Sequence, residues 1–327
     1  MKKLVFILLT LCVGFAASAQ TLTLKFSGIG MKSVAPINLK GVSNLVISAD
    51  SINGGATNAI TLTNCSNITI KNCKITGNAG TFGIFLIGCS NITVQNNYIY
   101  HIGAGVYAQN CTGGIVVSYN YMLNMQGPYP HADFIQFNNV SGAGNVISYN
   151  NLEDIAGQSN PEDAINVYKS NGTAASPILV TNNFIRGGGP STTGSGITVA
   201  DQGGSYQTIS NNIVINSGNV GMQVAGGTFI TLTNNTIYSS AFPYSHLGLG
   251  YGNYSGVPSS NVTIGNNKVK WMSGKAADLS YYAAGTSQIE KDASVQSGLT
   301  PPANWTTNAL GTPAPTNYLT VPLVVFQ

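Results

Sequence analysis

Charged side chains are scarce in this sequence. They make up 7% of the 327 residues, whereas ordinary globular domains carry about 25%. The chain contains a single arginine, Arg186, and no basic stripe. This composition argues against a nucleic-acid partner. It suits a protein whose surface is built from Asn, Thr, Ser and Gly.

Long apolar runs are also missing beyond the first twenty residues, so the sequence offers no membrane span. At its start, Lys2 and Lys3 precede an apolar run over residues 4–15, and Ala17-Ser18-Ala19 provides a small-residue cleavage site. These features are typical of a secretory signal. We therefore predict a signal peptide at residues 1–19 and a secreted or periplasmic protein, which we expect to be a monomer.

Cysteines are few, and they lack the spacing and the histidine partners of a zinc site. Four of them follow the predicted signal: Cys65, Cys73, Cys89 and Cys111. Cys65 and Cys89 fall at the same place in successive repeats, and Cys111 lies within one residue of it. One interpretation is a column of small buried side chains. The other is a disulfide between neighbouring repeats, which an exported protein permits.

A repeated nine-residue unit is abundant instead. In residues 91–99 (Asn-Ile-Thr-Val-Gln-Asn-Asn-Tyr-Ile), the second, fourth and ninth positions are apolar and the seventh is Asn. Nine copies begin at Asn44, Asn67, Asn91, Gly114, Gly144, Pro177, Tyr206, Phe229 and Asn261. The ninth position is apolar in every copy, and the alternation within the unit indicates a strand. The copies start 23 to 33 residues apart, which signals stacked repeats with a shared core.

Short strands, with Asn and Gly between them, predict an all-β fold of about nine coils, each stacked ~4.8 Å above the last. An Asn at the seventh position then lies on the Asn of the coil below, and its amide can bond to its neighbours and to the turn backbone. This Asn ladder resembles the right-handed parallel β-helices of the pectate-lyase-like superfamily. The resemblance implies a single-stranded right-handed parallel β-helix. We assign it to residues 20–270, with a C-terminal extension at residues 271–327 that packs on the helix.

A second strand follows each unit, and its outward positions form a polar and aromatic column. The column consists of Thr61, Phe85, Tyr107, Gln136, Asn166, Thr198 and Gln223. Such side chains along a flat parallel sheet suit a groove floor for a polysaccharide. Candidate substrate-binding residues are Tyr107, Gln136 and Asn166, together with the nearby Tyr129 and Tyr168. The alternative is that the column only presents polar groups to water, as any solenoid sheet must.

Three consecutive coils carry long linkers before this second strand, at residues 123–133, 153–163 and 186–195. Long loops in adjacent coils usually frame the working face of a repeat protein. The same region contains Lys169, Arg186 and six of the ten acidic residues: Asp133, Glu153, Asp154, Glu162, Asp163 and Asp201. Asp133 and Asp163 fall at equivalent positions of adjacent coils. Like charges ~5 Å apart are unfavourable unless a cation or a proton intervenes.

Residues 160–170 (Asn-Pro-Glu-Asp-Ala-Ile-Asn-Val-Tyr-Lys-Ser) resemble the acidic-then-Lys-Ser stretch of polysaccharide lyase family 6, the alginate and chondroitinase B lyases. The resemblance implies β-elimination, or the related C5 epimerisation, on a uronic-acid polysaccharide. It implies Glu162 and Asp163 as Ca²⁺ ligands, Lys169 as the base and Arg186 as the acid. We add Asp133 to the candidate Ca²⁺ ligands because of its position beside Asp163.

His131 is an alternative catalytic base, with Tyr129 beside it. The surrounding Pro-His-Ala-Asp stretch is similar to the Asp-Pro-His-Asp patch of mannuronan C5-epimerases. In this alternative, Lys169 would bind the substrate without taking its proton.

Two other classes of function stay open. Paired carboxylates among Asp133, Asp163 and Asp201 could hydrolyse a glycosidic bond, although the paired-Asp and Gly-His-Gly motifs of β-helical polygalacturonases are absent. A β-helix could also bind polysaccharide, or serve as a structural module, without any chemistry. The polymer itself cannot be read from the sequence.

Overall fold

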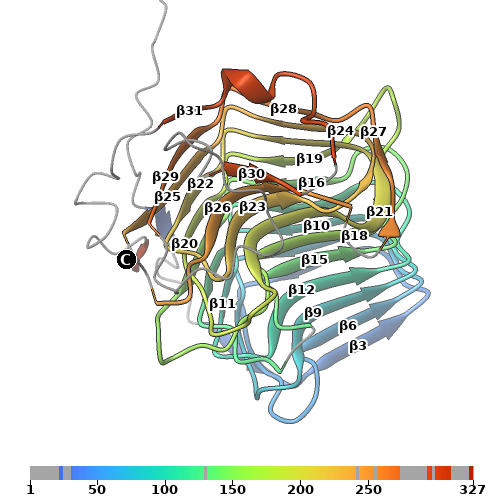
Figure 1. Cartoon of the computed structure of the whole chain (residues 1–327). Helices are drawn as coiled ribbons and strands as arrows, with labels where there is room; N and C mark the ends of the chain where they lie inside the picture. The colour runs from blue at the N-terminus through green and yellow to red at the C-terminus, as the bar shows by residue number, and fades with distance from the viewer. Residues whose placement is uncertain are drawn as a thin grey trace, which may run out of the picture.

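The chain folds into a stack of parallel β-strands (Figure 1). The computed structural model describes residues 22–24, 31–128, 131–240, 243–253, 256–272, 293–296, 299–310 and 324–326. The predicted signal peptide lies outside these ranges. Within them, no helix is long and apolar enough to cross a membrane. One short 3-10 helix, η2 (Trp305–Thr307), occurs near the end of the chain.

Each coil contributes a strand to three faces, which we call faces A, B and C. Face A contains β3 (Ile37–Lys40), β6 (Ile60–Thr63), β9 (Phe82–Ile87), β12 (Ala104–Gln109), β15 (Ile135–Asn138), β18 (Ile165–Asn171), the first half of β21 (Ser195–Ser210), β23 (Val220–Val224), β26 (Leu247–Tyr251) and β30 (Ala293–Val295). Face B contains β4 (Ser43–Ser48), β7 (Ser66–Lys71), β10 (Ser90–Gln95), β13 (Ile115–Ser118), β16 (Val146–Ser148), β19 (Ile178–Thr181), the second half of β21, β24 (Gly227–Thr233), β27 (Ser259–Ser260) and β28 (Thr263–Gly265). β21 bends through the corner between the two faces, which therefore form one 19-stranded sheet.

Face C is a separate 11-stranded sheet. It contains β2 (Lys32–Val34), β5 (Asp50–Asn53), β8 (Lys74–Thr76), β11 (Tyr98–Tyr100), β14 (Tyr121–Leu123), β17 (Asn151–Asp154), β20 (Phe184–Gly187), β22 (Ile213–Ile215), β25 (Thr236–Ser240), β29 (Lys268–Met272) and β31 (Ala309–Leu310). Apart from the three faces, β1 (Leu22–Leu24) pairs with β32 (Val324–Phe326). The long linkers of the sequence run from face C to face A, before β15, β18 and β21.

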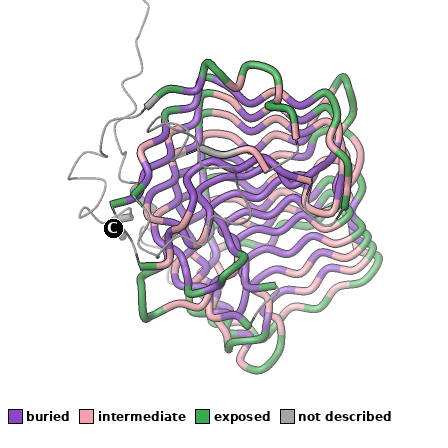
Figure 2. The backbone as a smooth tube through the Cα atoms, viewed as in Figure 1, coloured by how far each residue is buried: buried purple, intermediate pink, exposed green. Residues whose placement is uncertain are grey.

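Buried residues recur at the same places in successive coils (Figure 2). On face B, for example, Ile92 pairs with Ile68 on one side and with Ile115 on the other. The ninth-position column is fully buried in all nine copies: Ile52, Ile75, Ile99, Met122, Leu152, Ile185, Val214, Ile237 and Val269. The predicted parallel β-helix of about nine coils is therefore confirmed.

Asn forms a continuous ladder at the corner between faces B and C. The Oδ1 atom of Asn120 accepts hydrogen bonds from the backbone N–H and from Nδ2 of Asn97, both at 3.0 Å. The Nδ2 atom of Asn97 also donates to the carbonyl of Ile70, at 3.0 Å. The same arrangement joins Asn120, Asn150, Asn183, Asn212, Asn235, Asn267 and Asn308. The predicted ladder is confirmed, and its buried amides are hydrogen-bonded on both sides.

The ladder ends on a residue that the repeat pattern did not contain. Asn308 follows η2 and accepts from the backbone and side chain of Asn267 at 3.1 and 2.8 Å. The next residues form β31, which pairs with β29. Within the predicted C-terminal extension at residues 271–327, β30 pairs with β26, and residues 303–310 add a further rung to the stack.

The four described cysteines are buried free thiols rather than disulfides. Cys65, Cys89 and Cys111 stack in consecutive coils at the corner between faces A and B. The backbone N–H of Cys65 points at Sγ of Cys89, and that of Cys89 at Sγ of Cys111, each at 3.4 Å. Two coils later, Ser170 Oγ accepts the equivalent N–H from Val140 at 2.9 Å. The cysteines therefore form a column of small buried side chains, as the first interpretation proposed.

Candidate functional site

Three acidic residues, Asp133, Glu162 and Asp163, lie where the long linkers join face A. Asp133 precedes β15 by two residues, and Asp163 precedes β18 by two residues. The backbone N–H of Asp163 donates to Oδ1 of Asp133 at 3.0 Å. Both carboxyl groups are buried. They occupy equivalent positions of adjacent coils, in agreement with the coil register.

Asn166 links Asp163 to a third carboxyl group. Its Nδ2 atom donates to Asp163 Oδ2 at 2.6 Å and to Asp201 Oδ2 at 3.2 Å. The other oxygen of Asp163 accepts from Ser195 Oγ at 2.6 Å and from Thr198 Oγ1 at 3.2 Å. Asp201 lies in β21 and is only half-buried. We call Asp133, Asp163, Asn166 and Asp201 the carboxyl cluster.

Burial raises the pKa of every carboxyl group in this cluster. For Asp133, desolvation and the negative charge of Asp163 hold the pKa well above its usual range. Desolvation raises the pKa of Asp163 to about 7, against the opposing effect of the Ser195 hydroxyl. Desolvation also raises the pKa of Asp201, while the positive charge of Lys169 opposes the rise. These shifts favour protonated carboxyl groups in the cluster, and the charge of Asp163 makes the titration of Asp133 depend on it.

Three acceptor atoms, two in the cluster and one in Gln136, have no hydrogen-bond partner. They are Asp133 Oδ2, Asn166 Oδ1 and Gln136 Oε1, all fully buried. An unpaired buried polar atom costs about 1–3 kcal/mol, so a protein normally avoids it. A proton on Asp133 would turn one of these acceptors into a donor. This agrees with the direction of its pKa.

Lys169 is exposed at the end of β18. Its backbone is left-handed, with φ of 48°, and it takes the corner position that Asn64, Asn110 and Asn139 occupy in earlier coils with φ of 53–55°. Asn tolerates this conformation, whereas a long side chain rarely adopts it. The ammonium group lies 5.1 Å from the ring centre of Tyr168. Lys169 therefore stands at the solvent side of the cluster, close enough to affect the pKa of Asp201.

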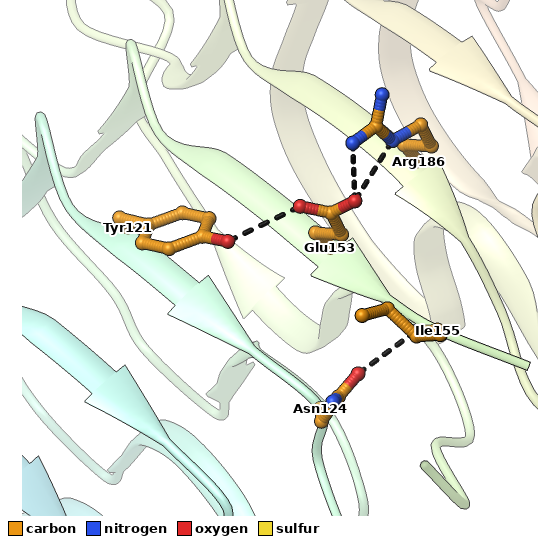
Figure 3. Close-up of polar contacts among 5 residues, drawn as sticks. All are labelled: Tyr121, Asn124, Glu153, Ile155 and Arg186. Carbon is orange, nitrogen blue, oxygen red and sulfur yellow. Dashed lines mark hydrogen bonds and ion pairs between the residues drawn. The ribbon is translucent and has the colours of Figure 1, made fainter. Parts of the chain in front are cut away.

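Arg186 lies on a different face of the molecule. It belongs to β20 of face C, where its Nε donates to Glu153 Oε1 at 2.9 Å, while Tyr121 donates its hydroxyl to Glu153 Oε2 at 3.1 Å (Figure 3). In the same view, Asn124 Oδ1 accepts the backbone N–H of Ile155, which ties together two of the long linkers. The sequence predicts one site that holds Arg186, Lys169 and the aspartates. The contacts of Arg186 place it with Glu153 instead.

The predicted Ca²⁺ ligands are largely engaged with protein donors. Glu162 accepts hydrogen bonds from the hydroxyl groups of Ser191 and Thr193. Both oxygens of Asp163 accept donors as well, which leaves Oδ2 of Asp133 as the one carboxylate oxygen of the three residues without a partner. Among the described residues, no group of three His, Cys, Asp or Glu side chains is arranged to hold a metal. This donor set does not fit a shared ion, and calcium stays a prediction.

Three rings on face A, those of Phe82, Phe85 and Tyr107, lie against one another. We call them the aromatic group. The ring of Tyr107 stacks on Phe82 at 4.9 Å, and the ring centre of His131 lies 5.3 Å from that of Tyr107. The hydroxyl of Tyr107 accepts a hydrogen bond from Asn138 at 2.6 Å. His131 is exposed. Tyr129, the remaining candidate, lies outside the described residues.

The predicted outward column exists, but much of it is not open to water. Tyr107, Gln136, Asn166, Thr198 and Gln223 pair in register across five strands, and each is buried, with 3–8% of its surface exposed. The prediction of an open groove floor is therefore wrong for these five side chains. Tyr168, the fifth candidate for substrate binding, is half-buried. The solvent-facing groups of this region are Tyr168, Lys169 and Asp201, at the edge of the column.

Two residues of the site were missed. Ser195 holds Asp163, and Phe82 supports Tyr107, yet neither belongs to the column used for prediction. Ser195 lies outside the nine-residue unit. It stands two residues before Ile197, as Asp163 stands two residues before Ile165, and Ile165 pairs with Ile197. The position equivalent to Asp163 in the next coil would therefore have identified Ser195 from the sequence.

Comparison with known families agrees with this architecture. The family model described as a right handed beta helix region matches residues 15–129. No curated protein matches the chain. With the parallel strands and the Asn ladder, the match shows a right-handed parallel β-helix, the fold of pectate-lyase-like and other carbohydrate-active proteins. A fold of this kind hosts several functions, so the chemistry must be argued from the site.

Proposed function

We propose that this protein is an exported enzyme that hydrolyses a polysaccharide on face A, with Asp163 and Asp201 as its pair of carboxyl groups. The observation that carries the proposal is the position of Asn166, whose single Nδ2 atom donates to both carboxyl groups. It holds two carboxyls from consecutive coils side by side. Glycoside hydrolysis needs a pair of this kind.

The raised pKa values of Asp163 and Asp201 suit acid–base chemistry at this pair. An efficient general acid or base has a pKa near the working pH, and the pKa of Asp163 is raised to about 7. Asp201 is the member of the pair that reaches solvent, and it would protonate the leaving glycosidic oxygen. Asp163 would form the bond to the anomeric carbon, and a water molecule deprotonated by Asp201 would then displace Asp163 and release the sugar. The negative charge of each carboxyl disfavours ionisation of the other.

The spacing of the pair predicts the stereochemistry of the product. Because both oxygens bond to the same nitrogen, at 2.6 and 3.2 Å, they lie at most about 6 Å apart. Carboxyl groups about 5–5.5 Å apart are typical of retaining enzymes, and separations above about 6.5 Å of inverting ones. We therefore expect retention of the anomeric configuration, which proton nuclear magnetic resonance of the first products detects.

Lys169 supports a second candidate, a uronate-polymer lyase or C5-epimerase. Its exposed ammonium occupies a corner where other coils use Asn, and a bulky residue in this conformation is often maintained for function. In this candidate, Lys169 or His131 removes the C5 proton. This candidate lacks its acid and its metal site near Lys169. Arg186 is bound to Glu153, and the predicted Ca²⁺ ligands Glu162 and Asp163 accept hydrogen bonds from protein donors. Hydrolysis needs fewer additional groups, and we rank it first.

Product analysis separates the two candidates. Xylan, mannan, β-glucan, alginate, pectate and glycosaminoglycans are incubated with the protein, with and without a chelator. Hydrolysis releases reducing ends alone, whereas a lyase releases unsaturated uronate, detected by its ultraviolet absorbance. Calcium dependence would appear as loss of product with the chelator. If no polymer is cleaved or epimerised, the enzyme proposal is wrong and a binding or structural role replaces it.

Substitution of Asp201 tests the mechanism. We expect Asp201→Asn to lower turnover about 10²- to 10⁴-fold, the usual contribution of a positioned acid or base, with little change in thermal unfolding. Asp50→Asn is the control, since it removes a carboxyl on face C and should leave turnover unchanged. Lys169→Ala should abolish turnover only if the lyase candidate is correct. Full activity of Asp201→Asn would contradict the hydrolase proposal.

A further inference from the structure

A pocket lies beside the aromatic group and extends from the coil of Gly80 to the coil of His131, two residues before Asp133 of the carboxyl cluster. Its volume is about 150 Å³. Three consecutive coils line it, with the residues Gly80, Phe82, Gly103, Gly127, Pro128 and His131. Nothing in the proposed hydrolytic mechanism uses it.

Glycine keeps this pocket open. Gly80 and Gly127 have left-handed φ values of 81° and 73°, and the N–H of Gly80 donates to the carbonyl of Gly127 at 2.6 Å. A Cβ atom on Gly103 would lie 2.7 Å from the nitrogen of Gly80, closer than such atoms approach. A Cβ on Gly80 would point towards Pro128, at 3.8 Å. Side chains at these positions would therefore strain the backbone or fill the space.

Phe82 forms a firmly supported aromatic wall. Its ring packs 4.9 Å from Phe85 and stacks on Tyr107 at 4.9 Å with an interplanar angle of 23°. Tyr107 is itself fixed by the hydrogen bond from Asn138. Phe82 remains half-buried rather than buried. A pre-positioned, partly exposed ring binds an apolar surface at little cost in conformational entropy.

From this geometry we infer that the pocket is a binding subsite for one uncharged sugar ring of the polysaccharide. A cavity of about 150 Å³ accommodates a single six-membered ring such as benzene, so the pocket would hold one ring and leave its hydroxyl groups towards the mouth, where His131 is exposed. The C–H face of a pyranose stacks on an aromatic side chain such as Phe82. The lining residues named above include no carboxylate, lysine or arginine, which favours a neutral ring over a uronate.

The pocket lies in line with the carboxyl cluster along the axis of the helix. Phe82 belongs to β9 and Asp163 precedes β18, with β12 and β15 between them. Three coils at ~4.8 Å each separate Phe82 from Asp163 by about 14 Å, whereas His131 of the pocket precedes the same strand as Asp133. A polysaccharide lying along face A would reach both. The inference thus rests on the proposed function, and it makes the pocket a positioning subsite on the coils that precede the proposed catalytic pair.

Titration calorimetry tests the subsite directly. Cello-, xylo- and mannooligosaccharides of two to six rings are titrated into Asp201→Asn, which should bind without consuming them. Trigalacturonate serves as the charged comparison. We expect Phe82→Leu in this background to weaken binding of the best six-ring ligand about five- to tenfold, the scale of a lost aromatic contact. His131→Gln should weaken it less, because the imidazole lies at the mouth.

Phe229→Leu is the matched control, because Phe229 is an exposed phenylalanine (46%) at a corner away from the pocket. It should leave binding unchanged. In the catalytically intact protein, Phe82→Leu should raise KM by the same factor and leave kcat near its original value. Thermal unfolding of each variant checks the fold.

The outcomes separate the subsite from the enzyme proposal. Cleavage with a KM that is indifferent to Phe82→Leu would overturn the subsite alone. Oligosaccharide binding that depends on Phe82, with no cleavage of any polymer, would support the subsite and overturn the hydrolase. Tighter binding of trigalacturonate than of every neutral oligosaccharide would overturn the assignment to an uncharged ring.

Discussion

The Asn ladder and the carboxyl cluster are two buried polar columns of the same β-helix, and they differ in how completely they are hydrogen-bonded. In the ladder, each amide oxygen from Asn120 to Asn308 accepts two donors from the preceding coil. In and beside the cluster, Asp133, Gln136 and Asn166 each have an oxygen atom without a partner. The ladder follows the corner between faces B and C, whereas the cluster lies on face A.

This difference indicates that the ladder stabilises the fold and that the cluster serves function. A fully bonded buried network stabilises a unique arrangement, whereas a partly bonded one costs free energy. The cluster is also where long linkers, raised pKa values and the exposed Lys169 occur together. Buried groups with perturbed pKa values are typical of functional sites. We therefore expect changes in the ladder to affect folding, and changes in the cluster to affect activity and pH dependence.

The largest effect on stability should come from breaking the ladder. Asn183→Ala removes four side-chain hydrogen bonds, to Ile147, Asn212 and Asn150. At about 1 kcal/mol or more for each buried bond, we expect the free energy of unfolding to fall by about 3–5 kcal/mol. Urea denaturation measures it. Asn182→Gly, at the adjacent left-handed corner position with φ of 57°, should cost far less. Equal losses would refute the special role of the ladder.

The cluster should instead make stability depend on pH. The pKa of Asp163 is about 7 in the folded protein, against about 3.9 for an unperturbed Asp, so the folded state binds more protons between these values. The stabilisation is complete below about pH 4 and is lost as pH rises towards 7, by up to about 1.4 kcal/mol per pH unit for each proton. Urea midpoints at a series of pH values measure this slope.

Asp133→Asn sharpens the same test. The amide keeps an oxygen for the N–H of Asp163 and replaces Oδ2, which has no donor, with a neutral NH₂ group. We expect stability at pH 5 to change by less than about 1 kcal/mol, and the loss between pH 4 and 7 to become smaller. Asp50→Asn should leave the slope unchanged. A slope identical to that of the original protein would show that Asp133 does not hold the proton.

An intermediate effect is expected for the ion pair on face C. Arg186→Met leaves the carboxylate of Glu153 with the hydroxyl of Tyr121, and both charged side chains are only 13% exposed. We expect a loss of about 1–2 kcal/mol in unfolding free energy, between the values for surface and buried pairs. Turnover per folded molecule should stay unchanged. A loss of turnover without loss of stability would restore Arg186 as the catalytic acid.

The smallest effect should come from the cysteine column. Cys89→Ser replaces a weak sulfur acceptor with the hydroxyl that Ser170 already provides in a later coil. We expect a change below about 1 kcal/mol, and no effect of reductant on thermal unfolding because the thiols are free. A marked drop in thermal stability with reductant would instead indicate a disulfide.

The sequence by itself determined the periodic part of this protein. One nine-residue unit fixed the strands, the buried ninth column and the ladder from Asn97 to Asn267, because each depends on residues that recur at the same place in every coil. It also identified the equivalence of Asp133 and Asp163, and the coils that carry long linkers. Asn308 escaped detection because it lies 41 residues after Asn267, beyond the spacing of the other copies, although Leu310 follows it as Val269 follows Asn267.

Only the tertiary structure decided which residues outside the repeated unit contact one another. The paths of the long linkers follow no period, so the sequence did not show that Gln136 and Asn166 are buried, that Glu162 is bound by Ser191 and Thr193, or that Glu153 engages Arg186 on face C. Stacking sets the register of a coil through short, repeated backbone contacts. The pairing of charges depends on packing between loops distant in sequence, and that packing is absent from any local pattern.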